Sequence, residues 1–158
     1  MTVRAYAADT SVSVERSRAE IEKTLARYGA DSFGYFTEAN RAVVAFRMSD
    51  RQIRFILSMP DKELREFTHT PAKGERRSAD GARIAWEQAC RQRWRALALV
   101  IKAKLEAVTA GITTVEDEFL AHTVLPDGTT FGQWAKPQLD QAYQLGHMPT
   151  QLLLGGPA

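Results

Sequence analysis

Cysteine and histidine, the usual soft metal ligands, are scarce in this chain of 158 residues. It has one cysteine, Cys90, and three histidines, His69, His122 and His147. A lone cysteine cannot form a disulfide within the chain, so the composition favours a reducing compartment. The histidines are far apart and have no cysteine companion, whereas zinc sites need clustered ligands. We therefore expect no metal site and no cofactor.

Long apolar runs, targeting patterns and catalytic signatures are also missing. No stretch approaches the roughly 18 apolar residues that suggest a transmembrane helix, and the N-terminus lacks a signal-peptide pattern. The sequence has no phosphate-binding glycine loop and no nucleophile elbow. Glu116, Asp117 and Glu118 precede His122 by about one turn, but acids at a helix start usually complement its dipole. We expect a cytoplasmic protein that is not an enzyme and has no membrane partner.

Charge of one sign is not in large excess. The formal net charge is +2, and 44% hydrophobic and 25% charged residues are ordinary for a folded domain. A chain of this length can bury a core without disulfides or metal. Because the net charge is small, only the positions of the cations can indicate nucleic-acid binding.

The longest periodic stretch predicts one helix from about Ser78 to Gly111. Ser78 suits an N-cap, and Gly111 suits a left-handed C-terminus. Arginines and lysines between the apolar positions give this helix a basic face. Its apolar residues recur at intervals of three and four: Trp86, Cys90, Trp94, Leu97, Ile101, Leu105 and Val108.

Residues 32–59 predict three strands that end before Pro60. Ser49 and Asp50 fit a two-residue hairpin turn, which places Met48 opposite Arg51. In this register one face of the hairpin is apolar, with the pairs Phe46 and Ile53, Val44 and Phe55, and Ala42 and Leu57. The opposite face is partly basic and carries the pairs Arg47 and Gln52, Ala45 and Arg54, and Val43 and Ile56.

Shorter elements complete the prediction. A helix starts at Ser13 or Ser17, where Ser17 and Glu20 match a capping box, and ends near Gly29. Residues 61–79 are a charged loop, interpreted as mobile. Thr113 with Glu116, and Thr130 with Gln133, are further capping boxes, and a last helix ends at Gly146 with Pro137 in its first turn.

This order predicts one α+β domain: an N-terminal helix, a three-stranded antiparallel sheet, a long central helix packed on the sheet, and short C-terminal helices. Its parts are a flexible arm (1–12), the core (13–111), a helical extension (112–146) and a tail (147–158).

Arginine is the dominant cation and occurs in two groups. Its planar fork suits phosphate, and an exposed Tyr35 or Phe36 would stack a base between such cations. We expect the two groups to converge on one positive surface, although arginines on a helix are also often only its solvent face. Arg47, Arg51 and Arg54 flank the hairpin turn, and Arg76, Arg77, Arg91 and Arg95 line the entry and early turns of the long helix.

Three segments resemble a group of small proteins encoded by bacteriophages and prophages: EQACRQRWRALALVIKAK (87–104), EFLAH (118–122) and LPDG (125–128). The resemblance implies a phage context and transfers no site residue. The order of one helix, three strands and one helix is also similar to the double-stranded-RNA-binding domain and to the core of phage single-strand annealing proteins.

Two functions follow as hypotheses. The first is a non-enzymatic nucleic-acid-binding accessory protein of phage origin that acts on single strands in recombination or replication. The alternative is a protein-interaction module that inhibits a host defence or nuclease complex through its basic helix and apolar tail. Either function is compatible with a homo-oligomer.

Overall fold

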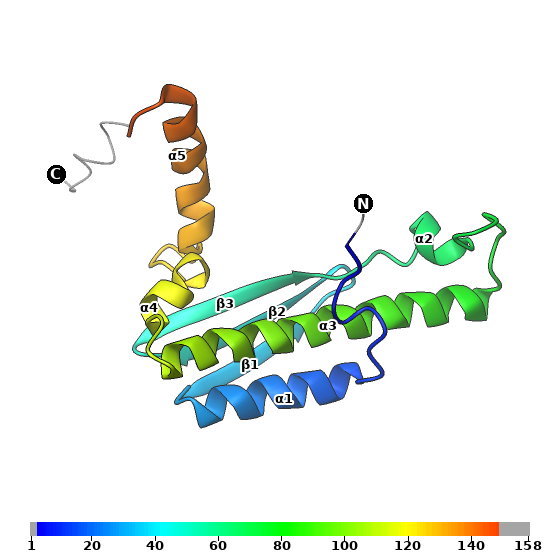
Figure 1. Ribbon diagram of the computed structural model, residues 1–158, viewed down its shortest axis with the longest axis horizontal. Coiled ribbons are helices and arrows are strands. Elements are labelled where there is room, and N and C mark those ends of the chain that lie inside the picture. Colours follow the sequence, from blue (N-terminus) through cyan, green and yellow to red (C-terminus); the bar gives the residue numbers. More distant parts are fainter. Residues whose placement is uncertain (1–2, 149–158) are drawn as a thin grey trace.

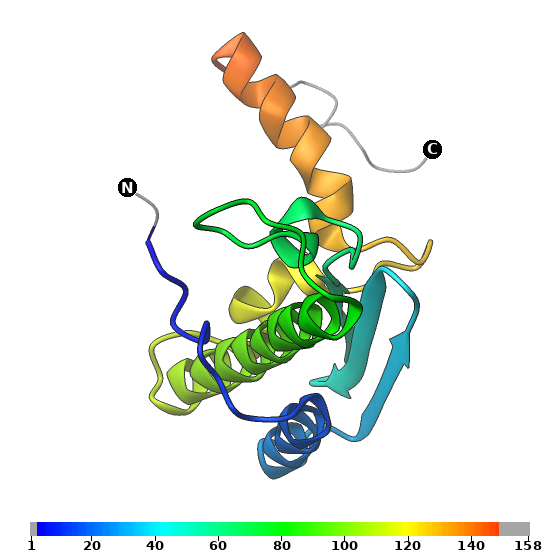
Figure 2. The same cartoon turned by 90° about the vertical axis from the view of Figure 1, so that its right-hand side faces the viewer.

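The computed structural model describes residues 3–148, which form an α+β fold. The strands β1 (Ser32–Thr37), β2 (Arg41–Met48) and β3 (Arg51–Ser58) make one antiparallel sheet in that order. The helices α1 (Val14–Arg27) and α3 (Ala79–Thr109) lie side by side on one face of the sheet (Figures 1 and 2). This arrangement confirms the predicted fold class. Within the described residues, no helix is both long enough and apolar enough to span a bilayer.

The hairpin between β2 and β3 has the predicted register. Met48 pairs with Arg51, Phe46 with Ile53, and Val44 with Phe55. Ser49 and Asp50 form the turn and have φ angles of 50° and 58°. Two successive left-handed residues are typical of a type I′ turn, whose twist matches that of the strands.

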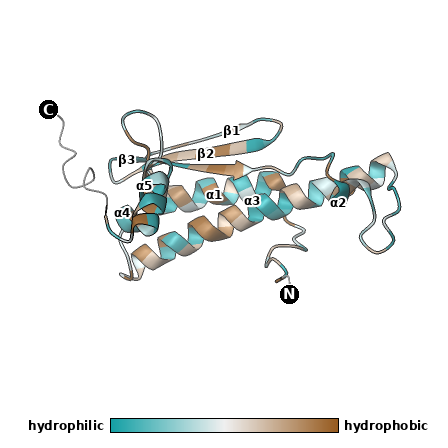
Figure 3. Ribbon diagram, turned by 90° about the horizontal axis from the view of Figure 1, so that it is seen from above, coloured by the Kyte–Doolittle hydropathy of each residue, from teal (hydrophilic) through white to brown (hydrophobic). Residues whose placement is uncertain are grey.

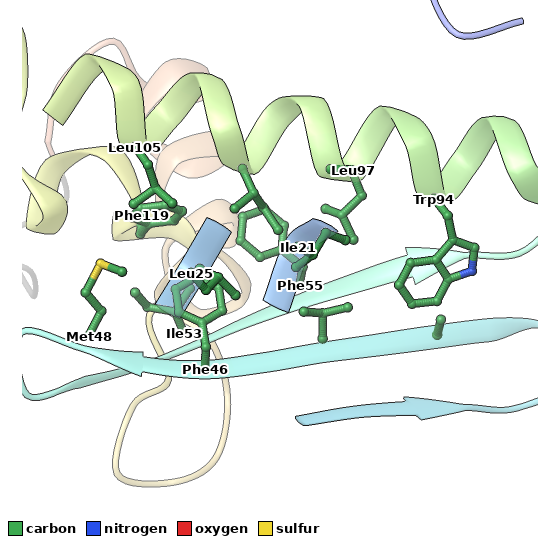
Figure 4. Close-up of a cluster of buried hydrophobic side chains, with 14 residues drawn as sticks. Ile21, Leu25, Phe46, Met48, Ile53, Phe55, Trp94, Leu97, Leu105 and Phe119 are labelled. Carbon is green, nitrogen blue, oxygen red and sulfur yellow. The ribbon is translucent and has the colours of Figure 1, made fainter. Parts of the chain in front are cut away.

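The core lies between the apolar face of the sheet and the two helices (Figure 4). Ile21 and Leu25 enter it from α1, and Trp94, Ile101 and Leu105 enter it from α3. These five side chains are at most 1% exposed. The apolar stripe predicted for the long helix therefore faces the sheet, as the spacing of three and four residues requires.

The short helix α4 (Val115–Glu118) leads to Phe119, which closes one end of this core. Its ring lies edge-on to Phe46, with centroids 5.6 Å apart, and to Phe55, with centroids 6.2 Å apart. Lys104 of α3 holds the same segment, because its ammonium donates to the carboxylate of Glu118 at 3.0 Å.

The start of α1 is one of its two predicted alternatives, and the start of α4 differs from the predicted one. Ser13 caps α1 by accepting a hydrogen bond from the Arg16 amide at 3.1 Å, whereas Ser17 is buried inside the helix. Thr114, not Thr113, caps α4 through the Asp117 amide. Serine or threonine is present at each alternative position, and the apolar residues that pack on the core decide which one caps.

The helix α5 (Phe131–Leu145) stands away from the sandwich (Figure 1). It begins with the predicted capping box of Thr130 and Gln133 and ends at Gly146. Pro137 lies inside this helix and not in its first turn, because the capping box fixes an earlier start. None of its residues is buried.

Residues 61–79, interpreted from the sequence as a mobile loop, contain the helix α2 (Arg65–Thr68) and a bridge between His69 and Arg76. Phe67 anchors α2 and is 5% exposed. Part of the predicted arm also contacts α3, because the Gln88 amide donates to the carbonyls of Ala8 and Thr10. Most of the predicted tail, from residue 149 on, lies outside the described residues.

Candidate nucleic-acid interface

The sheet has one face that no helix of the described residues covers. Both α1 and α3 lie on the apolar side and leave the opposite side, called the outer face below, without a helix (Figures 2 and 3). The loop before α5 approaches one end of this face, where the Gly128 carbonyl accepts a hydrogen bond from Arg54. The register arranges the outer face in three rows across the strands: Phe36, Val43 and Ile56, then Gly34, Ala45 and Arg54, then Ser32, Arg47 and Gln52.

The first row is an exposed apolar strip. Phe36 is 58% exposed and Ile56 is 45% exposed, with Val43 between them. Gly34 in the next row has no side chain, and no other part of the protein lies within 4 Å of where its Cβ would be. The outer face therefore leaves space beside the exposed Phe36 ring, where a planar group can lie against it.

A shallow hollow of about 300 Å³ adjoins this strip. Ser32, Gly34, Arg47 and Gln52 contribute to its lining. The hollow thus places hydrogen-bond donors and one guanidinium group beside the apolar row, a combination that suits a base and its phosphate.

Arg47 is exposed and is paired with Asp31. Its Nε lies 2.8 Å from one carboxylate oxygen of Asp31 and 3.0 Å from the other. The hydrogen bond from Arg47 lowers the pKa of Asp31, and the same bond raises the pKa of Arg47. Exposed pairs of this kind contribute little to stability, so a phosphate can compete with Asp31 for the guanidinium.

Two further arginines lie on this face: Arg54 in the second row, on the edge strand β3, and Arg41 beyond the first row. Arg54 is fixed in place, because its Nη2 donates to the Gly128 carbonyl at 2.8 Å, and its buried Nε has no partner within residues 3–148. Arg41 lies at the far end of β2 and pairs with Glu38 at 2.5 Å. The outer face therefore has an apolar centre with cations at its margins.

The predicted arginines of the long helix do not lie on this face. Arg95 pairs with Glu20 of α1 at 2.5 Å, and Arg91 donates to the Gln88 side chain at 3.1 Å. Because α3 packs on the opposite side of the sheet, neither residue joins Arg47 and Arg54. The expected single positive surface is absent from the described structure.

The remaining predicted residues are also elsewhere. Arg51 lies at the hairpin turn opposite Met48, in register with the apolar face. Arg76 bridges to His69, and Arg77 donates through its backbone amide to the Thr68 carbonyl at 2.7 Å. Tyr35 pairs with Val44 and so faces α1 and α3. Its neighbour Phe36, also considered from the sequence, is the aromatic residue on the outer face.

The predicted register already placed Val43 and Ile56 on the same face as Arg54. Sequence reasoning did not select Gly34 or Arg41 for this surface. Strand alternation could have found Gly34, because it pairs with Ala45 once the register is set. Residues 3–148 contain no group of three or more His, Cys, Asp or Glu side chains that could hold a metal ion.

Comparison with protein-family models, with curated proteins and with solved structures finds no match.

Proposed function

We propose that the chain binds single-stranded nucleic acid on the outer face of its sheet. The observation that supports this function is the exposed Phe36, in a row with Val43 and Ile56 and flanked by Arg47 and Arg54. An aromatic residue on an open antiparallel sheet is also how RNA recognition motifs stack bases. The role would be non-enzymatic, as an accessory protein in recombination or replication. The phage context stays a prediction from the sequence resemblance.

The geometry favours single strands over duplexes. A flat sheet can stack unpaired bases, whereas a duplex hides the faces of its bases. Few cations border the outer face, so stacking must supply much of the affinity. Base stacking on an aromatic side chain contributes about 1–3 kcal/mol per base and tolerates any sequence.

Fluorescence polarisation with labelled 20-mers of deoxythymidine and of uridine tests this proposal. Loss of 1–3 kcal/mol corresponds to roughly 5- to 150-fold weaker binding for Phe36→Ala. Arg47→Gln should weaken binding and make it less dependent on salt. If the bound strand makes three phosphate contacts, the logarithm of the association constant should fall by about 2 for each tenfold rise in salt concentration.

The matched control is Arg16→Gln, because Arg16 is an exposed arginine on α1, away from the sheet. This variant should bind like the wild type. The proposal is overturned if the wild type does not bind either oligonucleotide at low salt. It is also overturned if Phe36→Ala and Arg47→Gln bind as tightly as Arg16→Gln.

One observation favours the alternative function, a protein-interaction module. The helix α5 exposes Trp134, Leu139, Tyr143 and Leu145, which are 44%, 55%, 82% and 50% exposed. Co-purification from a nuclease-treated bacterial lysate distinguishes the two functions. A partner that survives nuclease and is lost with Leu139→Ser and Tyr143→Ser together supports this alternative.

A further inference from the structure

A groove of about 480 Å³ opens on the helical side of the molecule, away from the outer face. It lies between the start of α1, the turn that joins β1 to β2, and the first half of α3. Its apolar walls include Val14, Met59, Trp86, Cys90 and Trp94. Small-ligand sites are usually hollows of about 300–1,000 Å³ with apolar walls and a few polar groups. The groove has these dimensions and this composition.

Arg18 lies in this groove in an unusual environment. Its guanidinium carbon is 4.7 Å from the centroid of the Tyr35 ring and 4.7 Å from that of Trp94. The Nε of Arg18 is buried and has no hydrogen-bond partner within residues 3–148. Arg18 has no ion pair with any residue in that range. Aromatic faces offset part of the cost of withdrawing a cation from water, but an anion would offset more.

Arg91 lines the same groove from α3, opposite α1. Its guanidinium donates to the neutral side-chain oxygen of Gln88 and, in the described residues, to no carboxylate. Two guanidinium groups that have no acidic partner among the described residues therefore border one hollow from two helices.

The acids of the groove do not neutralise these arginines. Glu38 is paired with Arg41, and Glu87 is paired with Arg83 at 3.0 Å. Glu15 has no ion pair among residues 3–148. Among the described residues, the charged side chains of the groove without an ion pair are thus Arg18, Arg91 and Glu15. Their summed charge is positive, which favours binding of an added carboxylate.

We propose that this groove binds a small aryl carboxylate. The carboxylate accepts hydrogen bonds from Arg18 and Arg91, since a planar guanidinium fork matches its geometry. The aromatic body of the ligand lies against Trp86, which is partly exposed, because the Trp94 ring is buried beneath the Arg18 guanidinium. This site is separate from the outer face of the sheet, so it does not depend on the proposed nucleic-acid function.

Isothermal titration calorimetry with 1-naphthaleneacetate tests the proposal on the full chain. The neutral analogue 2-(1-naphthyl)ethanol has a similar body and no carboxylate. We expect the acid to bind at least about tenfold more tightly than the alcohol, because a charge-assisted hydrogen bond contributes about 1.5–3 kcal/mol. Equal binding of the two compounds, or no heat from the acid at millimolar concentration, overturns the proposal.

Variants place the ligand in the groove. Arg18→Gln and Arg91→Gln should each weaken binding of the acid about tenfold or more. Arg16 does not line the groove, so Arg16→Gln should leave binding unchanged. Because Arg18 packs on Trp94, its replacement also disturbs the core, so Arg91→Gln is the decisive variant. If Arg91→Gln is folded by circular dichroism and binds the acid as tightly as the wild type, the proposal is wrong.

Discussion

Asp50 occupies the second position of the hairpin turn with a φ of 58°, a conformation in which a Cβ is unfavourable. Glycine adopts this conformation readily, and type I′ turns favour it at that position. We expect Asp50→Gly to raise the free energy of unfolding by about 0.5–1 kcal/mol, measured by urea denaturation. Gln52→Gly in β3 is the control and should be destabilising, because glycine weakens a strand interior. A loss of stability in Asp50→Gly would contradict the account of the turn.

Phe119 has a fully buried side chain that contacts residues from two strands. Replacing it with alanine removes apolar burial and leaves a cavity, which typically costs about 3–5 kcal/mol. We expect Phe119→Ala to lose this much stability in urea denaturation, and Phe119→Leu to lose less. If Phe119→Ala costs under 1 kcal/mol, the segment after α4 is not part of the core.

His122 stacks on Phe55, with ring centroids 3.9 Å apart. Its pKa is lowered first by burial and then by the charge of Lys104. A histidine whose pKa is lower in the folded state binds its proton more readily when unfolded. Its contribution to stability is therefore complete above the unfolded pKa, near 6.5, and is lost as the pH falls through that value toward the folded pKa.

Urea denaturation at pH 8 and at pH 5.5 should show this loss in the wild type and a smaller loss in His122→Gln. Some dependence remains in the variant, because burial also lowers the pKa of His69. An unchanged difference between the two pH values in His122→Gln would show that His122 is not responsible.

At the scale of elements, α5 begins in close contact with the short 3-10 helix η1 (Leu120–His122). A Cβ on Gly132 would lie 2.9 Å from the Ala121 carbonyl oxygen, which is too close for a real contact. We expect Gly132→Ala to be destabilising by about 1–3 kcal/mol, as for other overpacked sites. Without this contact, the same change would stabilise a helix by about 1 kcal/mol. The sign of the change in urea denaturation therefore tests how α5 is attached.

The elements that sequence analysis predicted well depend on local periodicity. The long helix has an apolar stripe between a serine cap and Gly111, and the hairpin register follows from a two-residue turn. Helix starts were predicted less exactly, because several neighbouring hydroxyl residues can act as an N-cap. The start of α1 was left between Ser13 and Ser17, and that of α4 was assigned to Thr113, whereas Thr114 is the cap. The helix α2 depends on the burial of Phe67, a contact with distant parts of the chain that local pattern does not contain.

At the scale of the whole molecule, the sandwich has two layers and one open face. Alternation along β2 and β3 correctly placed Arg47 and Arg54 on one side of the sheet. The expectation that α3 would add its arginines there conflicts with the sheet's own geometry. A helix that packs on the apolar face has its polar side on the far side of the molecule, and Arg95 also binds Glu20. The ion pair between Arg95 and Glu20 joins residues far apart in the chain, so sequence spacing does not predict it.

The groove between α1 and α3 also depends on how distant parts of the chain pack together. Arg18, Trp86 and Trp94 come from two helices that meet only in the folded chain. The sequence places Trp86 and Trp94 on one helical stripe, but it does not show that Arg18 lies over the Trp94 ring.

The measurement that most directly tests the outer face as the binding surface is a ¹⁵N NMR titration with an unlabelled deoxythymidine 20-mer. We expect the backbone amides of Gly34, Phe36, Val43 and Ile56 to shift most, while those of α1 and α3 stay nearly unchanged. Shifts that concentrate on α1 and α3, or no shifts at low salt, would contradict it.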